Sequence, residues 1–198
     1  MSRLIETIRL YNGRLSNLEY HQVRMDKAFR EMILKKNKSV LEDYFKTIVV
    51  PQHGLYKCRL VYDDKRCNVE FVPYQFRPIN SLKIIENNSI VYSHKFEDRT
   101  ELNSLFNLRD KGDDVLIIKN NEVTDTSFSN IVFKQNDKWF TPKSCLLNGT
   151  MRQYLLEQKV ISEIEIRLAD IKQYEKFKLI NSMLQFSADE MDVDKIIF

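Results

Sequence analysis

The chain has 198 residues, of which 43% are hydrophobic and 30% charged, and it contains only four glycines and four prolines. A chain of this length and composition can bury a substantial core, which excludes a disordered chain and a small domain that depends on disulfides. Its 31 basic residues are interleaved with 28 acidic ones, giving a formal charge of +3. Because nucleic-acid binding usually needs a clustered basic surface, no nucleic-acid partner is expected.

Three cysteines, Cys58, Cys67 and Cys145, have spacings that match neither a disulfide framework nor a zinc site. We therefore expect free thiols in a reducing compartment and no bound metal. Polar and charged residues interrupt the N-terminal segment, so it does not have the apolar run of a signal peptide. No segment is apolar over the length that spans a bilayer, and the sequence predicts a cytoplasmic protein without a membrane partner.

The first half of the chain is predicted to form a small α+β domain. Apolar runs between turn residues indicate strands, and apolar residues at intervals of three and four indicate helices. Ser16 and Glu19 have the spacing of a capping box before the first helix, and Ser39 is expected to open the second. The predicted elements in chain order are a strand over 4–11, a turn at Asn12-Gly13 that returns through Arg14 and Leu15, a helix over 18–32, a helix over 40–48, and a hairpin of strands 55–62 and 67–74.

Prolines and polar residues thin out the pattern between Pro73 and Ser81, so we expect a first domain over 1–80 and a second α+β domain over 81–198. The polar run from Glu122 to Asn130 is interpreted as a long loop. The predicted elements of the second half, in chain order, are strands over 82–85 and 90–92, a helix-like segment over 97–106, a strand over 114–119, a turn at Asn120-Asn121, strands over 130–134 and 139–140 joined at Asn136-Asp137, a helix from Gly149 to about Gln158, and a strand over 178–186.

Lys95 is a candidate nucleophile. It lies where a β-type segment is predicted to end, and side chains at such positions commonly face clefts. A lysine amine attacks a carbonyl only when it is deprotonated, so a site must disfavour its charge by desolvation or by a nearby cation such as His94 or Arg99. The alternative is an inert surface lysine that pairs with a neighbouring carboxylate such as Glu97.

Three further segments each allow two interpretations. Gly149 follows an apolar pair and precedes an amphipathic helix, an arrangement that suits phosphate but also a plain helix start. Arg24 flanks the apolar stripe of the first helix, so it either points inward to an anion or lies along the surface. Asp125 lies in the polar run, where a carboxylate is either fixed beside a ligand or left in a loop.

Taken together and in this order, these segments resemble the class IV pyridoxal-phosphate family, which includes branched-chain aminotransferases, D-amino-acid aminotransferases and aminodeoxychorismate lyases. The resemblance covers nearly the whole chain and implies a two-domain α+β architecture of the D-amino-acid aminotransferase type, PLP fold type IV, with the active site between the domains of a homodimer. Five motifs carry it: Ile5-Glu6-Thr7-Ile8-Arg9, His21-Gln22-Val23-Arg24-Met25, His94-Lys95-Phe96-Glu97-Asp98-Arg99, the run from Val123 to Phe133, and the run from Leu146 to Gln153.

The resemblance also assigns roles to individual residues. It makes Lys95 the catalytic residue, which carries pyridoxal 5'-phosphate as a Schiff base. Arg24 and the backbone amides that follow Gly149 contact the cofactor phosphate, and Asp125 stands where the family has a glutamate that pairs with the pyridine nitrogen. The implied cofactor-binding residues are Arg24, Lys95, Asp125, Ser129, Asn130, Gly149, Thr150 and Met151.

The chain departs from the family pattern at two places. Asp125 is a shorter carboxylate than the usual glutamate, and Thr126 replaces the glycine that normally follows it. The chain also begins almost at the strand containing Glu6, without the preceding strand and Gly-Asp-Gly turn of the family. These departures leave open a member with altered pocket loops or altered catalysis.

The sequence from Gly149 to Gln153 is more similar to the lyase version of this motif than to the aminotransferase version. We therefore expect a 4-amino-4-deoxychorismate lyase that releases pyruvate and forms 4-aminobenzoate for folate biosynthesis. One alternative is a class IV aminotransferase that acts on branched-chain or D-amino acids, since the motif residues serve both reactions. A second alternative is a non-catalytic protein that has kept the fold.

Overall fold

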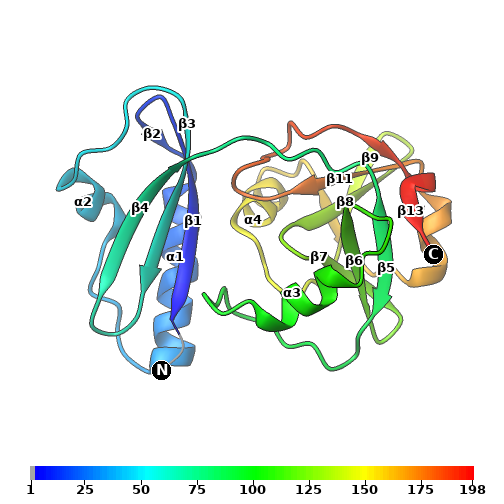
Figure 1. The fold of residues 1–198 in the computed structure, drawn as a ribbon, viewed down its shortest axis with the longest axis horizontal. Helices are drawn as coiled ribbons and strands as arrows, with labels where there is room; N and C mark the ends of the chain where they lie inside the picture. Colours follow the sequence, from blue (N-terminus) through cyan, green and yellow to red (C-terminus); the bar gives the residue numbers. More distant parts are fainter. Residues whose placement is uncertain (1–2) are drawn as a thin grey trace. The chain divides into compact units, whose positions relative to one another are not determined.

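The structure is a computed structural model, and it describes residues 3–198 (Figure 1). The chain folds into two compact units. The first contains the residues up to Phe76 together with the segment His94–Asp98, and the second contains Arg77–Ser93 and Arg99–Phe198. The chain therefore leaves the first unit, returns to it for the short segment that contains Lys95, and leaves it again.

The first unit is built on a four-stranded antiparallel sheet with the order β2-β1-β3-β4. Figure 1 shows α1 lying along one face of this sheet. Met25 and Ala28 of α1 pack there against Ile8 and Leu60 of the sheet, which gives the unit its own hydrophobic core. Its elements are β1 (Leu4–Tyr11), β2 (Arg14–Leu15), α1 (Leu18–Ala28), a π-helical turn η1 (Phe29–Ile33), α2 (Leu41–Lys46), β3 (Leu55–Tyr62) and β4 (Cys67–Pro73).

Most predicted elements of the first unit are confirmed. The strand over 4–11 has the predicted bounds, and the Asn12-Gly13 turn is possible because both residues adopt positive φ values, of 47° and 78°. The predicted capping box at Ser16 is wrong. The backbone N–H of Ser16 donates to the carbonyl of Arg9, which keeps Ser16 in the hairpin, and α1 instead follows Asn17 without a side-chain cap.

The second helix is also shorter than predicted. It begins after Val40, without a side-chain cap from Ser39, and it ends at Lys46. The backbone N–H of Leu41 donates to the Gln22 side chain on α1, so a tertiary contact, and not a local cap, satisfies the start of this helix.

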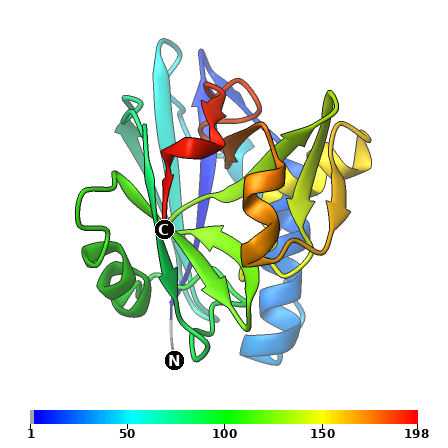
Figure 2. The ribbon, with the colours of Figure 1, turned by 90° about the vertical axis from the view of Figure 1, so that its right-hand side faces the viewer.

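The second unit is a larger mixed sheet with short helical segments. Its main path has the order β10-β9-β8-β7-β6-β5-β13, and β11 also pairs with β8. Figure 2 shows the C-terminal segment in red beside β5, with which β13 pairs in parallel. The elements are β5 (Leu82–Glu86), α3 (Thr100–Asn107), β6 (Asp114–Lys119), β7 (Glu122–Thr126), β8 (Asn130–Gln135), β9 (Lys138–Pro142), α4 (Thr150–Glu157), β10 (Ser162–Ile164), η2 (Leu168–Gln173), β11 (Lys176–Ile180), β12 (Met191–Asp192), η3 (Val193–Lys195) and β13 (Ile196–Ile197).

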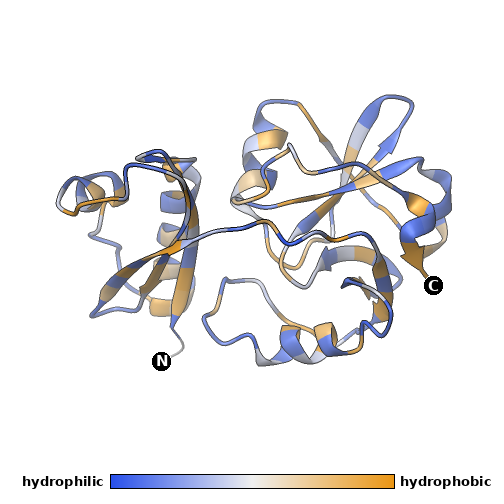
Figure 3. Ribbon diagram, turned by 45° about the horizontal axis from the view of Figure 1, so that its top comes forward, coloured by the Kyte–Doolittle hydropathy of each residue, from blue (hydrophilic) through white to orange (hydrophobic). Residues whose placement is uncertain are grey.

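Clusters of buried side chains form the interior of the second unit, and two of them bear on the site. One surrounds Leu116 and Phe133 in the middle of the sheet, and the other joins α4 to the sheet through Met151, Leu155 and Val132. Helix α3 is amphipathic, and Figure 3 shows hydrophobic and hydrophilic residues alternating along it. The second cluster matters for the site because it fixes the start of α4 against β8.

The predictions over 114–119, 130–134 and 139–140 and the helix after Gly149 are confirmed within a few residues. The predicted strand over 90–92 is wrong. The chain there is irregular, and the carbonyl of Ile90 accepts a hydrogen bond from the Lys119 side chain. The helix predicted over 97–106 begins only at Thr100. Lys95 therefore lies in an irregular segment and not at the end of a strand.

Two further predictions are corrected. The late strand ends at Ile180, not at Phe186, because the Asn181 side chain accepts hydrogen bonds from the backbone of Met183 and Leu184 and turns the chain. The polar run after Glu122 is not a long loop. It forms β7 and a tight turn, and its buried polar side chains are hydrogen-bonded.

Among residues 3–198, no helix combines the length and apolar character needed to cross a membrane. Within the same residues, no group of three or more His, Cys, Asp and Glu side chains is arranged to hold a metal ion. The three cysteines are free thiols.

Candidate active site

Glu6 is the buried centre of a polar cluster in the first unit. On β1 its side chain shares a face with Leu4 and Ile8, which pack in the core under α1, so it points to that core. Arg24 donates from Nε to Oε1 over 2.9 Å and from Nη2 to Oε2 over 2.5 Å, and His21 Nδ1 lies 2.5 Å from Oε2. Two helix residues thus converge on one strand carboxylate.

The charges in this cluster are settled by these contacts. Burial alone would raise the pKa of Glu6, but the charge of Arg24 and the hydrogen bonds of His21 and Arg24 lower it to about 2. Burial is the main cause of the lowered pKa of His21, against the opposing effect of Glu6. At neutral pH Glu6 is therefore ionised and His21 neutral, and the Nδ1–H of His21 donates to the carboxylate.

Lys95 belongs to a short segment that is fastened to the beginning of β1. Its carbonyl accepts a hydrogen bond of 2.9 Å from the backbone N–H of Ile5, and Phe96 forms an isolated bridge with Leu4. The lysine side chain is half-buried. Its positive charge is among the causes that lower the pKa of His21, after burial and the charge of Arg24, so Lys95 lies within electrostatic range of the Glu6 cluster.

The neighbouring carboxylate of Glu97 is occupied by arginines. Arg3 lies 2.6 Å from Oε2, and Arg59 donates from Nη2 to Oε1 over 2.7 Å. Arg59 is therefore an ion-paired residue that holds the Lys95 segment against β3.

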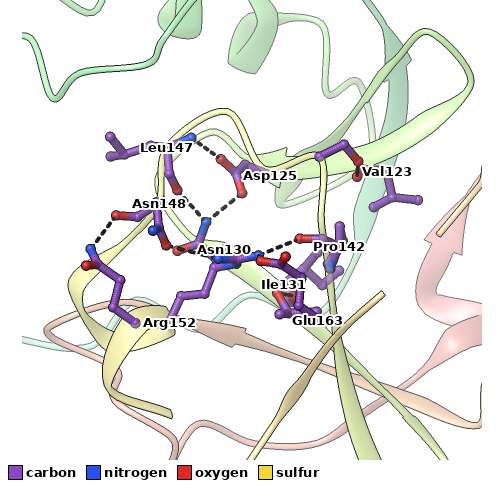
Figure 4. A network of polar contacts seen from close by, with 12 residues as sticks. Val123, Asp125, Asn130, Ile131, Pro142, Leu147, Asn148, Arg152 and Glu163 are labelled. Atoms are coloured by element: carbon purple, nitrogen blue, oxygen red, sulfur yellow. Dashed lines mark hydrogen bonds and ion pairs between the residues drawn. The ribbon is translucent and has the colours of Figure 1, made fainter. Parts of the chain in front are cut away.

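Asp125 is the corresponding buried carboxylate of the second unit. It stands opposite Asn130 in the pairing of β7 with β8. Asn130 Nδ2 donates to Oδ1 over 2.7 Å, and the backbone N–H of Leu147 donates to Oδ2 over 2.9 Å (Figure 4). Burial raises the pKa of Asp125 to about 6, although these donors and the charge of Arg152 lower it.

The turn between Asp125 and Asn130 is closed by hydroxyl groups. The Thr126 Oγ1 accepts a hydrogen bond from the backbone N–H of Ser129, and the Thr126 N–H donates to the Ser129 carbonyl. Asn181 then donates from Nδ2 to the Ser129 Oγ over 2.8 Å. Thr126, which occupies the position of a family glycine, is thus used to close the turn.

Gly149 directly precedes α4 and lies against Asn130. A Cβ at this position would be 2.1 Å from the Asn130 Oδ1, which is a steric clash. The φ of Gly149 is −65°, so close approach and not backbone freedom requires the glycine. Thr150 and Met151, the first helical residues, are buried, and no side chain caps their helix end. Backbone N–H groups at such an end are suited to an anion.

The structure therefore gathers the predicted residues into two groups. Arg24 and Lys95 lie in the first unit. The second unit contains the remaining predicted residues, which are Asp125, Ser129, Asn130, Gly149, Thr150 and Met151.

Sequence reasoning gave no role to Glu6, His21 or Arg152, which organise these groups. A polar residue at an inward position of a strand was the available signal for Glu6. An arginine beside Met151 on the inward face of α4 was the signal for Arg152, which is 2% exposed.

Comparisons with known proteins agree with this arrangement. The profile of the family described as amino-transferase class IV matches residues 102–188. An uncharacterised protein from Haemophilus influenzae is 36% identical over 186 residues, which are 92% of this chain and 98% of that protein.

Two solved structures extend the comparison. A proposed 4-amino-4-deoxychorismate lyase from Haemophilus somnus has 36% identity and a TM-score of 0.86, over 92% of this chain and 97% of that chain. The pyridoxal-phosphate-bound form of a hypothetical aminotransferase from Mycobacterium tuberculosis has a TM-score of 0.78 at 18% identity, over 96% of this chain and 80% of that chain, and so supports the fold alone.

The mixed architecture with two units is that of fold type IV aminotransferases, as the resemblance implied. This chain spans 98% of the Haemophilus influenzae protein and 97% of the Haemophilus somnus protein, and the family profile covers the part of the chain that contains Asp125 and Gly149. The chain belongs to the class IV aminotransferase family of enzymes.

Proposed function

We propose that this enzyme is a pyridoxal-phosphate-dependent 4-amino-4-deoxychorismate lyase, which converts its substrate into 4-aminobenzoate and pyruvate. The observation that carries the proposal is the identity of 36%, over 97% of that chain, to the proposed lyase from Haemophilus somnus. The likeness of the Gly149 to Gln153 segment to the lyase version of the family supports the same choice.

The residues of each unit fit the cofactor. Asp125 is a buried carboxylate that two donors hold in place, and a carboxylate has further lone pairs for a pyridinium N–H. The absence of a side chain at Gly149 allows the start of α4 to lie close to Asn130, and backbone N–H groups at a helix start are suited to a phosphate. In the first unit, the nearly buried guanidinium of Arg24 is a cation of the kind that pairs with a phosphate.

These residues have distinct tasks in the proposed reaction. Bound pyridoxal phosphate supplies an electron sink for the bond that is broken in an attached amino substrate. Asp125 keeps a proton on the ring nitrogen, because an ionised carboxylate in a buried site favours a positive partner. Arg24 and the amides of Thr150 and Met151 hold the phosphate. Lys95 attaches the cofactor, and its Nζ then takes a proton from the substrate and returns one to the product.

A homodimer in the cytoplasm belongs to the same proposal. The dimer is implied by the family resemblance, and light scattering of the purified protein tests it by giving the mass of one chain or of two. The free thiols of Cys58, Cys67 and Cys145 are consistent with a reducing compartment.

The test is pyruvate release from aminodeoxychorismate by purified protein with added pyridoxal phosphate and no 2-oxo acid. We expect release by the wild type, none by Lys95→Ala, and normal release by Lys65→Ala, a control at an exposed turn position. If the wild type binds the cofactor but releases no pyruvate from aminodeoxychorismate, the lyase proposal is wrong. Amino transfer after addition of a 2-oxo acid would then identify an aminotransferase, and binding without any turnover a non-catalytic member.

A further inference from the structure

Arg152 is a buried charge that the proposed reaction does not use. Its side chain is 2% exposed, and among residues 3–198 it is the largest of the fully buried side chains. Burying a guanidinium is costly unless its hydrogen bonds are satisfied, so such a residue usually has a definite structural or functional task.

The guanidinium joins the first turn of α4 to three other places in the second unit (Figure 4). Nη1 donates over 3.0 Å to the Oδ1 of Asn148, the residue before Gly149. Nη2 donates over 2.9 Å to the carbonyl of Pro142 at the end of β9, and it pairs with the carboxylate of Glu163 on β10. Since β9 and β10 pair in parallel at these positions, Arg152 ties the Asn148 side chain to the edge of the sheet.

Asp125 and Asn130 hold the same turn, Leu147–Gly149, from its other side. The N–H of Leu147 donates to Asp125, and the Leu147 carbonyl accepts a hydrogen bond of 2.8 Å from Asn130 Nδ2. Gly149 lies against the Oδ1 of that Asn130. The segment Leu147–Gly149 is therefore fixed between Asn130 on one side and Arg152 on the other.

The charge of Arg152 also reaches the carboxylate at this turn. Burial raises the pKa of Asp125, and the positive charge of Arg152 is among the causes that oppose this rise. Glu163, whose side chain is 38% exposed, is the counter-charge of Arg152. Its negative charge does not cancel the effect of Arg152 on Asp125, because the charge of Arg152 still lowers the pKa of Asp125.

We infer that Arg152 is a positioning residue, which holds the Asn148–Gly149 turn and the first N–H groups of α4 in the shape that binds the cofactor phosphate. The inference rests on the proposed function. It goes beyond it by assigning a task to a side chain that would act on the ligand through its hydrogen bond to Asn148. A guanidinium is suited to this task because its fixed fork of donors serves Asn148, Pro142 and Glu163 at once.

The test compares two probes that differ only in the phosphate. Arg152→Met removes the donors and the charge, and Arg152→Lys keeps the charge but cannot reach all three acceptors. Both variants are expected to bind pyridoxal phosphate about tenfold more weakly than the wild type, the effect of a lost supporting hydrogen bond in a binding site, and to bind pyridoxal within about twofold of it. Lys65→Ala serves as the control for both probes.

A second measurement follows amide hydrogen exchange at Thr150 and Met151 in protein prepared without cofactor. Faster exchange is expected in Arg152→Met and, to a smaller extent, in Arg152→Lys. This exchange measurement distinguishes the proposed function from the structural role of Arg152. Faster exchange in the variants of a protein whose wild type binds neither probe would contradict the proposed function but support the hold of Arg152 on the turn.

Three results would overturn the inference. The first is unchanged exchange at Thr150 and Met151 in both variants. The second is pyridoxal phosphate affinity equal to that of the wild type. The third is an equal loss of affinity for pyridoxal phosphate and pyridoxal, which would assign Arg152 to general stability of the unit.

Discussion

Glu6 and Asp125 are both buried carboxylates, yet their partners give them opposite properties. Burial tends to raise the pKa of each, but ionic and hydrogen-bond partners lower that of Glu6 to about 2, whereas Asp125, held by neutral donors, has a pKa raised to about 6. Glu6 therefore stays ionised and works as a fixed anchor for Arg24. Asp125 titrates close to neutral pH, as functional carboxylates in buried sites often do.

Replacing the anchor should reduce stability. Glu6→Gln leaves Arg24 without its buried counter-charge, and we expect the free energy of unfolding at pH 7 to fall by about 3–5 kcal/mol. The folded pKa of Glu6 is depressed from 4.5 to about 2, so its stabilising contribution is present above pH 4.5 and is lost as the pH falls towards 2. Urea unfolding between pH 2 and 5 should show a weaker pH dependence in the variant. An unchanged dependence would contradict this assignment.

Asp125 predicts a pH dependence of cofactor binding. Because its pKa is about 6, the carboxylate gains its charge as the pH rises through 6, and affinity for a pyridinium ring should rise with it. Titration with pyridoxal measures this without the titration of a phosphate. The rise should remain in Asp125→Glu and disappear in Asp125→Asn, since the amide does not ionise. A rise of equal size in Asp125→Asn would assign the pH dependence to another group.

The residue types of the site were predictable only in part from the sequence. The motifs around Arg24, Lys95, Asp125 and Gly149 are local, so resemblance could locate them. The use of Glu6 depends on a contact between β1 and α1, fifteen or more positions apart in the chain. No spacing within one motif contains that information.

At the scale of elements, the close packing of α4 on β8 determines the structure of the candidate phosphate site at Gly149 and the start of α4. Met151 and Leu155 pack on Val132, which presses the helix start against Asn130. The position of Gly149 in this contact leaves no space for a methyl group.

Gly149→Ala should therefore disturb both stability and binding. The added Cβ would meet the Asn130 Oδ1 at 2.1 Å, so either Asn130 or the helix start must move. We expect a loss of about 1–3 kcal/mol in the free energy of unfolding, the usual cost of overpacking, together with weaker binding of pyridoxal phosphate. Chemical denaturation and a fluorescence titration measure the two effects. Wild-type values in both would show that the contact is not restrictive.

Elements with a strong local pattern were predicted well, and those set by tertiary contacts were not. The strand over 4–11 and the helix after Gly149 follow from periodicity and turn residues. The strand predicted over 90–92 fails because the backbone of Ile90 hydrogen-bonds the side chains of Asn87 and Lys119 and not a neighbouring strand. The polar run that became β7 was misread because hydrogen bonds among its buried side chains replace the apolar pattern of an ordinary strand.

At the scale of the whole molecule, the return of residues 94–98 to the first unit is the feature that composition could not predict. Backbone bonds to Arg3 and Ile5, and the ion pairs of Glu97, hold this segment beside β1. As a result Lys95 shares a unit with Arg24, while Asp125 and the start of α4 belong to the other. Each unit thus contains a buried carboxylate and a candidate phosphate contact among the predicted or organising residues, Glu6 and Arg24 in one and Asp125 and the start of α4 in the other.

The most direct test of the account is to identify the lysine that carries the cofactor. Protein incubated with pyridoxal phosphate is treated with borohydride, which makes the attachment permanent, and is then digested and analysed by mass spectrometry. The account predicts one modified peptide, with the label on Lys95, and no label at that level in Lys95→Ala. A label spread over exposed lysines, or on a different single lysine, would contradict the assignment of Lys95.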